Sequence, residues 1–457
     1  VSYSYKDKYL AEVNTGWTGS ENFAVGKKFG LFPAVSAGWV ISREDFFDRL
    51  SSTFSLVKLR ASYGVTGNDN IGGGGRFPYI TQYGGGNSTG FGLNGNWYGG
   101  ITESVIGVEN LTWERSYKKD LGLEIGIKNR LNVIVDVFQE HRKDILIARS
   151  SISSAAGYSG TAVYANLGEM NNRGMDASFE YNNKIGRVGL RVFGNVTYSN
   201  NKIVFQDEPI RKYGYQRSTG HHYGEFTGYI AEGLFKDQAD IDNSPTQQFG
   251  VVAPGDIKYQ HLTGKDDNVI NAYDWTYLGK SWFPSWLYGA GFSVMYHKFD
   301  VSLFFQGVQD VGIMANGSWI SGDGWGSDGA GVVPFSGMGE FPNNTLANAV
   351  DRWTPANPRQ NAYYPRLTMG SLGDNNYAGS TWWLKDGAYM RLKQASLGYT
   401  LSSVRLKRGG LSSLYFYLSG MNLLTFSKFK LWDPELGSNG AKYPITRTVT
   451  FGIRAEF

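Results

Sequence analysis

The stretch Leu121–Val137 reads LGLEIGIKNRLNVIVDV, and it decides the fold. Apolar residues stand at every second position on both sides of the dipeptide Asn129-Arg130. A period of two is that of a β-strand, because successive side chains of a strand point to opposite faces. Two such runs joined by a two-residue connection predict a β-hairpin.

The same alternation recurs along most of the chain. The other segments that show it most clearly are Val35–Ile41, Val57–Tyr63, Met175–Tyr181, Leu190–Tyr198, Tyr288–Tyr296, Val301–Phe305 and the stretches near 389–401, 411–425 and 443–457. About thirteen strands can be counted, and no helical period is long enough to cover a sheet. The pattern therefore predicts an all-β protein.

The connections between these strands alternate in length. Short ones are expected at 6–8, 42–54, 128–131, 182–187, 297–300 and 402–411, and long ones at 18–31, 64–112, 150–168, 199–283, 312–388 and 425–443. A soluble sandwich has no reason to sort its loops in this way, whereas outer-membrane barrels have tight periplasmic turns and long extracellular loops. Strands of about nine to eleven residues also suffice to cross a bilayer core. We therefore expect a transmembrane antiparallel β-barrel.

Composition narrows the class further. Aromatic residues make up 15% of the 457 positions, which is not the composition of a disordered chain. The absence of Cys excludes a disulfide scaffold, thiolate metal sites and a cysteine nucleophile. The net charge is only +4 and no Lys/Arg block is present, so a nucleic-acid partner is disfavoured.

The last eight residues, Thr450–Phe457, read TFGIRAEF. A polar residue is followed two places on by Gly, and apolar residues stand at the last and third-last positions. This ending resembles the closing-strand signal read by the outer-membrane barrel assembly machinery, which gives Thr450, Gly452, Ala455 and Phe457 the role of an assembly signal. Phe451, Ile453, Ala455 and Phe457 would then line the lipid face. The alternative is an ordinary amphipathic strand that stops at Phe.

Short blocks along nearly the whole chain carry a family resemblance. They are YKDKYL (5–10), FPAVSAGW (32–39), VKLRASYGVTGN (57–68), LTWE (111–114), NLGEMNNRG (166–174), PGDIKY (254–259), RWTP (352–355), YPRL (364–367), YMRLK (389–393), MNLL (421–424) and DPE (433–435). Each block is unspecific by itself. In this order, the chain resembles the C-terminal part of a SusC/RagA-type TonB-dependent outer-membrane transporter.

The resemblance implies a barrel of 22 strands filled by an N-terminal plug domain that carries the TonB box. We expect residues 1–457 to supply about thirteen C-terminal strands, with the plug, the TonB box and the first strands absent. An odd number of strands does not close a bacterial single-chain barrel, and open edges in hydrocarbon cost several kcal/mol per unpaired backbone group. The remaining strands are therefore expected from another segment, in a chain that is either nicked in an extracellular loop or discontinuous. Inward-facing residues such as Lys58, Arg60 and Glu124 are expected to form a polar, water-lined wall.

The function that the resemblance implies is active import of oligomeric nutrients across the outer membrane of a Gram-negative bacterium. Glycans are the expected cargo, with peptides as the alternative. The implied partners are a SusD-like surface lipoprotein, the remainder of the transporter, the TonB complex, outer-membrane lipid and the substrate. A passive porin or structural barrel and a soluble lectin-like β-protein are the competing interpretations.

No motif indicates an enzyme, a cofactor or a metal site. The five histidines show no metal-ligand spacing, and His221-His222 is expected to be a solvated loop pair. Gly279-Lys280-Ser281 resembles the end of a phosphate loop, but Asp274 stands where its first Gly is required. Residues 324–329 satisfy a dinucleotide Gly spacing without the strand and helix that the motif needs.

Two further sets of residues are candidates for ligand binding. Trp97, Tyr98, Trp319 and Trp325 lie in Gly/Asn/Ser-rich stretches, where exposed rings can stack on a sugar or pack against a peptide. Contact with a lid protein or another loop is the alternative. The run 260–271 falls where members of this family carry a calcium-type loop, but His261 and Thr263 replace its oxygen ligands. We therefore expect no bound Ca²⁺ there.

Overall fold

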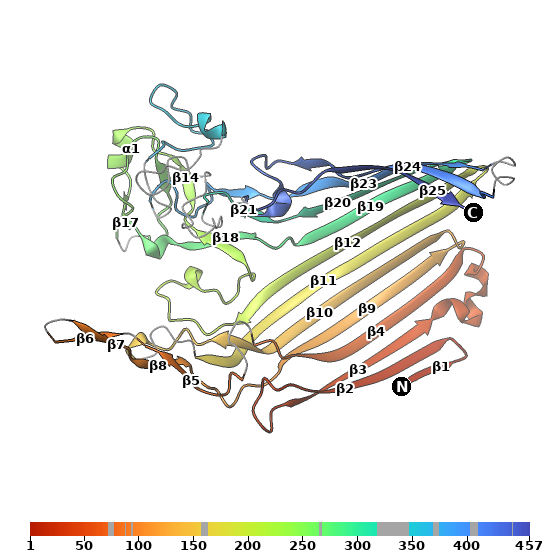
Figure 1. Ribbon diagram of the computed structural model, residues 1–457, viewed down its shortest axis with the longest axis horizontal. Helices are drawn as coiled ribbons and strands as arrows, with labels where there is room; N and C mark the ends of the chain where they lie inside the picture. The colour runs from red at the N-terminus through yellow and green to blue at the C-terminus, as the bar shows by residue number, and fades with distance from the viewer. Residues whose placement is uncertain are drawn as a thin grey trace. The chain divides into compact units, whose positions relative to one another are not determined.

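The protein is described by a computed structural model, shown in Figure 1. It describes residues 1–71, 77–86, 88–92, 95–156, 163–264, 267–317, 347–368, 374–402, 410–440 and 442–457. The chain forms two compact units, and each is described by itself. Unit 1 contains residues 1–180, 197–211 and 217–222, and unit 2 contains residues 181–196, 212–216 and 223–457.

The main element is one sheet of thirteen strands in the described part of the chain, in the order β1-β2-β3-β4-β9-β10-β11-β12-β19-β20-β23-β24-β25. Their bounds are β1 Ser2–Tyr5, β2 Tyr9–Gly19, β3 Phe29–Val40, β4 Phe54–Asn68, β9 Glu114–Ile127, β10 Leu131–Ala148, β11 Tyr164–Ile185, β12 Val188–Phe205, β19 Trp286–Tyr296, β20 Phe299–Gln309, β23 Tyr389–Leu401, β24 Ser413–Ser427 and β25 Thr448–Glu456. Long strands run side by side within each unit (Figure 1). The prediction of about thirteen strands is confirmed.

Shorter elements lie in the connections. The strands are β5 Gln82–Gly85, β6 Thr89–Phe91, β7 Asn96–Tyr98, β8 Ile101–Val105, β13 Glu225–Gly228, β14 Ala231–Leu234, β15 Thr246–Gln247, β16 Ile257–Tyr259, β17 Val269–Ile270, β18 Thr276–Ser281, β21 Gly312–Met314 and β22 Leu384–Asp386. The α-helix is α1 Gln238–Asp242, and the 3-10 helices are Ile41–Arg43, Asp45–Leu50, Ser154–Ala156, Gly214–Gln216, Ala272–Asp274, Ala347–Val350 and Pro434–Leu436. In the described residues, no helix combines the length and the apolar content that crossing a membrane requires.

The hairpin expected around Asn129-Arg130 is present, with its turn one residue earlier. Ile127 pairs with Leu131, and the Arg130 N–H donates to the Ile127 carbonyl at 2.9 Å. Lys128 and Asn129 have φ of 49° and 54°. Positive φ at both central residues defines a type I′ turn, whose twist matches that of the strands. The dipeptide Lys128-Asn129 is therefore the centre of the turn.

The expected alternation of short and long connections holds for most of the sheet. Turns of two or three residues follow β1, β9, β11 and β19, and connections of 11–13 residues follow β3 and β23. The connections after β4, β10, β12, β20 and β24 have 15 to 80 residues, and the exception is the nine-residue connection after β2. Sheet neighbours are also neighbours in sequence. Every second connection of such an antiparallel sheet leaves from the same end of its strands, so the long connections of each unit share an end.

One face of the sheet in unit 1 is apolar and exposed. Tyr9, Trp39, Leu59, Leu123 and Val135 form one cross-strand row from β2 to β10. In the next row, Leu121 is 53% exposed. A soluble sandwich would bury this face between two sheets, and the structure shows it uncovered.

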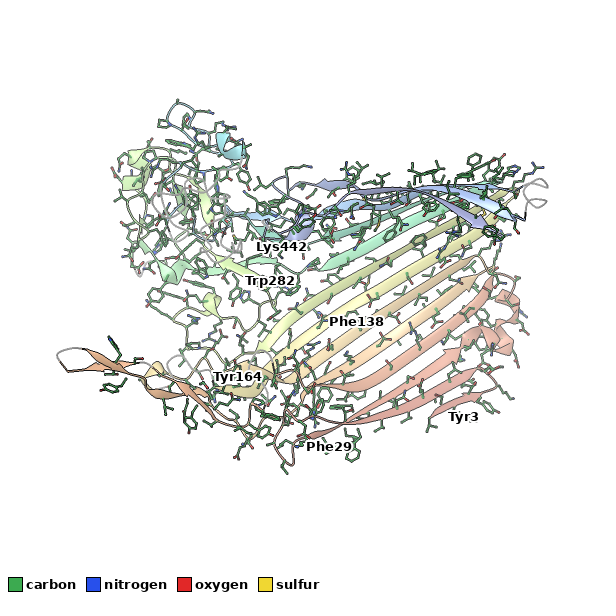
Figure 2. All side chains as sticks on the ribbon, viewed as in Figure 1. Tyr3, Phe29, Phe138, Tyr164, Trp282 and Lys442 are labelled. Atoms are coloured by element: carbon green, nitrogen blue, oxygen red, sulfur yellow. The ribbon has the colours of Figure 1, made fainter. Side chains whose placement is uncertain are left out.

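Aromatic residues lie at both ends of this apolar face. Tyr9 and Trp17 stand on the same face of β2, eight residues apart, which is roughly 27 Å along a strand. The Trp17 ring packs on Phe29 with centroids 4.9 Å apart. Figure 2 shows Tyr3 and Phe29 toward opposite ends of the first strands. Outer-membrane barrels carry such aromatic girdles on either side of an apolar band about 25 Å tall.

In unit 2 the same pattern continues to the last strand. Val301, Leu397, Leu418 and Phe451 form one row across β20, β23, β24 and β25. Phe451 is 67% exposed, and Ile453 on the same face of β25 is also exposed. The C-terminal strand therefore places its apolar side chains on the exposed face.

Unit 2 also contains a folded region that alternation alone does not predict. This region, here called the loop body, has a core of buried aromatic and aliphatic side chains. It consists of residues 223–264, 267–281, 347–368 and 374–386. Trp383, Tyr364, Tyr377 and Ile257 are fully buried in it. Segments that the sequence pattern assigns to two separate long loops thus pack together into one hydrophobic core.

Candidate functional site

The opposite face of the sheet in unit 1 carries paired charges. Lys58 Nζ lies 3.3 Å from Glu124 Oε1, directly across β4 and β9. The Arg60 guanidinium donates to both Asp136 carboxylate oxygens at 2.8 Å, although Asp136 lies two strands away. This face is a polar wall, as expected for Lys58, Arg60 and Glu124.

Gly122 explains how Arg60 reaches across an intervening strand. Gly122 lies opposite Arg60 on one side and Asp136 on the other. A Cβ built at Gly122 would overlap the Asp136 carboxylate and lie 2.5 Å from Arg60 Nε. The missing side chain therefore creates the passage for the ion pair.

Unit 2 repeats this arrangement with different residues. The Tyr415 hydroxyl donates to Asp300 Oδ2 at 2.9 Å, and both groups pass over Gly398 of the strand between them. Ser302 and Ser396 hydrogen-bond across β20 and β23 at 2.6 Å. In both units, a glycine of the intervening strand thus leaves room for two polar side chains to meet on the polar face.

A buried arginine fastens a long connection to the sheet. Arg391 of β23 is 1% exposed, and it donates to Asp433 at 2.6 Å and to Glu435 at 2.7 Å. Its Nε donates to the Thr425 hydroxyl at 3.1 Å. Asp433 also accepts from the Glu435 N–H at the start of the 3-10 helix Pro434–Leu436. The blocks YMRLK and DPE thus meet in this ion-pair cluster.

The block PGDIKY supplies the polar centre of the loop body. Asp256 is 2% exposed and accepts both hydrogen bonds of the Arg366 guanidinium at 2.8 Å, together with one from Asn376 at 2.7 Å. Gly255 has φ +90°, and a Cβ there would overlap the Trp353 ring. In the sequence analysis, the blocks PGDIKY, RWTP and YPRL indicated only the family resemblance. Their buried Asp256, Trp353 and Tyr364 belong to one packed region, which the alternation of strands does not predict.

Hydrogen bonds to two carboxylates, those of Asp267 and Asp274, hold the described residues of the run 260–271. The buried Asp274 carboxylate accepts from the backbone N–H groups of Leu262 at 2.6 Å and Asn271 at 2.9 Å. Asp267 lies 2.9 Å from His261 Nε2 and 3.1 Å from the Thr263 hydroxyl. The hydrogen bond from His261 is the largest cause of a lowered pKa for Asp267. The side chains of His261 and Thr263 are therefore both within hydrogen-bond distance of the Asp267 carboxylate.

The aromatic candidates for ligand binding are only partly placed by the structure. Trp97 and Tyr98 lie in β7, which pairs with β6 in a small hairpin, and they are 74% and 58% exposed. Adjacent residues of a strand point to opposite faces, so the two rings do not form one platform. Figure 1 shows β6 and β7 among the long connections of unit 1. Trp319 and Trp325 lie outside the described residues.

The four residues of the expected assembly signal lie in or after β25. Thr450 pairs with Ser419, and Ala455 pairs with Leu414. A Cβ at Gly452 would overlap the ring of Tyr417, which lies directly opposite on β24. A side chain at position 452 would therefore require the Tyr417 ring to move. Phe457 follows the last paired residue with its side chain exposed.

The motifs considered for metal or nucleotide binding lie only partly within the described residues. Within the placed ranges, no group of three or more His, Cys, Asp or Glu side chains is arranged to hold a metal ion. Lys280 of the phosphate-loop-like run pairs with Asp310 at 2.5 Å. Residues 324–329 fall outside the placed ranges.

Comparisons with known proteins find relatives that match the chain over its whole length. The chain is 29% identical to the TonB-dependent receptor P26 of Formosa agariphila and 24% identical to the TonB-dependent receptor SusC of Bacteroides thetaiotaomicron, in each case over 100% of the chain and 45% and 43% of the relative. A solved structure of the RagAB peptide transporter matches with a TM-score of 0.75 at 20% identity, over 100% of this chain and 46% of that one. The chain thus spans a little under half the length of these relatives.

A match to a protein-family model shows to which family the chain belongs. The model described as "TonB dependent receptor-like, beta-barrel" matches residues 1–423, which is most of the chain. The matched region contains the sheet from β1 to β23 together with the loop body. The chain belongs to the TonB-dependent receptor β-barrel family.

Proposed function

We propose that this chain is the C-terminal part of an outer-membrane importer of oligomeric nutrients, energised through TonB, in a Gram-negative bacterium. In the whole transporter, these thirteen strands form part of a 22-stranded barrel that surrounds an N-terminal plug. Family membership supports the class. The exposed apolar face of the sheet is the observation that carries the proposal, because only lipid makes that exposure favourable over so many strands.

The two faces have different roles in this proposal. The apolar face, with aromatic residues at both ends, lies against lipid. The face with Lys58, Arg60, Glu124 and Asp136 lines a hydrated lumen, in which their ion pairs remain in contact with water. No step of chemical catalysis is assigned to either face.

The long connections form the extracellular side and meet the cargo. A SusD-like surface lipoprotein that caps these loops is the proposed partner. The exposed Trp97 and Tyr98 support glycans as cargo, since flat aromatic rings stack on the apolar face of a sugar. Peptides are the alternative cargo, because the structurally similar RagAB is a peptide transporter.

Uptake measurements test this function. Cells that carry the whole transporter and the proposed SusD-like lipoprotein are given labelled oligosaccharides or peptides, with and without TonB. The proposal expects oligosaccharide accumulation that is lost without TonB or in the presence of a protonophore. Accumulation that continues unchanged in both cases would show a passive pore instead.

The C-terminal strand is proposed to carry the assembly signal in Thr450, Gly452, Ala455 and Phe457. Removing Phe457 should lower the amount of folded transporter in the outer membrane several-fold, measured by heat-modifiable migration in gels. Tyr443 precedes β25 and is 83% exposed, so Tyr443→Ala removes another exposed ring outside the last strand and is the control. Equal losses in both variants would argue against a C-terminal signal.

A further inference from the structure

A cavity opens in the loop body of unit 2. Its lining comes from β14, from the segment around 351–363 and from the segment that leads into β22. The lining residues on which the inference depends are Glu232, Gln360, Asn361, Tyr363, Trp382 and Lys385. None of them was singled out by the sequence patterns.

Lys385 is the unusual member of this lining. Its ammonium group donates to the Trp382 carbonyl at 2.7 Å and lies 4.8 Å from the centre of the Tyr363 ring. Among the described residues, no carboxylate lies within ion-pair distance of it. Lys258 and Lys280 in the same loop body do have such partners, Asp240 and Asp310. The cavity thus contains a half-buried cation for which the described residues supply no counter-ion.

The other charged groups around the cavity do not neutralise Lys385. Asp351 is ion-paired with Arg359. Glu232 is exposed and makes no ion pair with Lys385. A partly buried ammonium gains more from an anion than an exposed one does, because water competes less strongly there.

The remaining lining is held in place by hydrogen bonds to the backbone. Trp382 Nε1 donates to the Tyr363 carbonyl at 3.2 Å, and Gln360 Oε1 accepts from the Leu234 N–H at 3.2 Å. The cavity therefore combines two aromatic rings with the amide side chains of Gln360 and Asn361. Ring surfaces beside a few fixed polar groups are typical of sites that bind small ligands.

We propose that this cavity binds the carboxylate of an acidic sugar unit, such as a uronic acid, within an oligosaccharide. The ammonium of Lys385 pairs with the carboxylate, the Trp382 and Tyr363 rings contact the sugar ring, and the amides bond to hydroxyl groups. This inference rests on the proposed import of glycans and specifies one chemical class of cargo. Rings and amides suit a hydroxyl-bearing ring better than an extended peptide.

Calorimetric titration of the purified whole transporter tests the site. The probes are tri-galacturonic acid, the neutral trisaccharide maltotriose and the peptide tri-glutamate. We expect tri-galacturonic acid to bind at least tenfold more tightly than either of the others. Lys385→Gln and Lys385→Met should weaken its binding about tenfold or more, since a charge-assisted hydrogen bond is lost. Lys236→Ala, on an exposed lysine outside the cavity, should leave binding unchanged.

The pH dependence provides a second readout. Burial lowers the pKa of Lys385 to about 8. The charged form binds the carboxylate, so affinity should be constant below about pH 8 and fall as the pH rises above it. Lys385→Arg stays charged to much higher pH, and its affinity should not fall in that range.

Three outcomes would overturn the inference. They are equal binding of acidic and neutral trisaccharides, no effect of both Lys385 variants, and preferential binding of tri-glutamate. Unchanged melting temperatures of the variants establish that they are folded. TonB-dependent uptake of a neutral oligosaccharide would still support the importer when the site fails, so the two proposals are tested separately.

Discussion

At the scale of single residues, glycines decide which polar side chains can meet across the sheet. Gly122 lies between Arg60 and Asp136, and a Cβ there would overlap their ion pair. Alternation identified the polar face but not this role, because pairing between residues two strands apart depends on register. In the sequence, an ion pair that crosses an intervening strand is indicated only by a Gly at a polar-face position of that strand.

Gly122→Ala should therefore destabilise the protein by about 1–3 kcal/mol, the usual cost of overpacking. Gly38 lies in the same cross-strand row, on the other side of Arg60. A Cβ at Gly38 would approach Leu10 to no less than 3.4 Å. Gly38→Ala should have little effect on thermal unfolding in detergent, and equal effects of the two substitutions would refute the role given to Gly122.

Arg391 is the second residue with a specific prediction. Truncating Arg391 to Ala leaves the partly exposed carboxylates of Asp433 and Glu435 without their shared partner, and losing a hydrogen bond to a charged group costs about 1.5–3 kcal/mol. The segment 428–447 should then be cleaved faster by added protease. Arg359→Ala removes an arginine from an exposed pair and serves as the control. Unchanged cleavage after Arg391→Ala would contradict the role of this cluster.

At the scale of elements, the period of two predicts the strands and their two faces. The expected hairpin at Asn129-Arg130 was placed one residue too late, because alternation locates strands but not the residues of positive φ. The alternation of short and long connections was predictable because the length of a connection depends only on where the strands begin and end. The strands of the loop body were not, since most have two to four residues and are held by the shared core.

The two faces of a strand should respond differently to charge. Leu121→Arg places a cation on the apolar face, which costs about 2–4 kcal/mol at the middle of a bilayer. Ser62→Arg, on the adjacent β4, places it on the polar face opposite Asp120. We expect the first variant to lower the amount of folded protein in the outer membrane and the second to be tolerated. A similar loss in both would contradict the assignment of the faces.

At the scale of the whole molecule, the loop body is a core separate from the strand faces. Trp383 is fully buried and donates to the Asn376 carbonyl at 2.9 Å. Trp383→Ala should destabilise the loop body by about 3–5 kcal/mol. Hydrogen exchange should rise in the loop body but not in β1–β4, and a uniform rise would contradict separate cores.

The central claim is that the apolar face contacts lipid and the polar face contacts water. The chain has no Cys, so Leu121→Cys and Ser62→Cys each give it one labelling site, in register-adjacent positions of β9 and β4. Each variant of the whole transporter, with any Cys outside this chain replaced by Ser, is labelled with an environment-sensitive fluorophore in membranes. We predict quenching by lipid-attached nitroxide at position 121 and by aqueous iodide at position 62. Reversed or equal quenching at the two positions would contradict the claim.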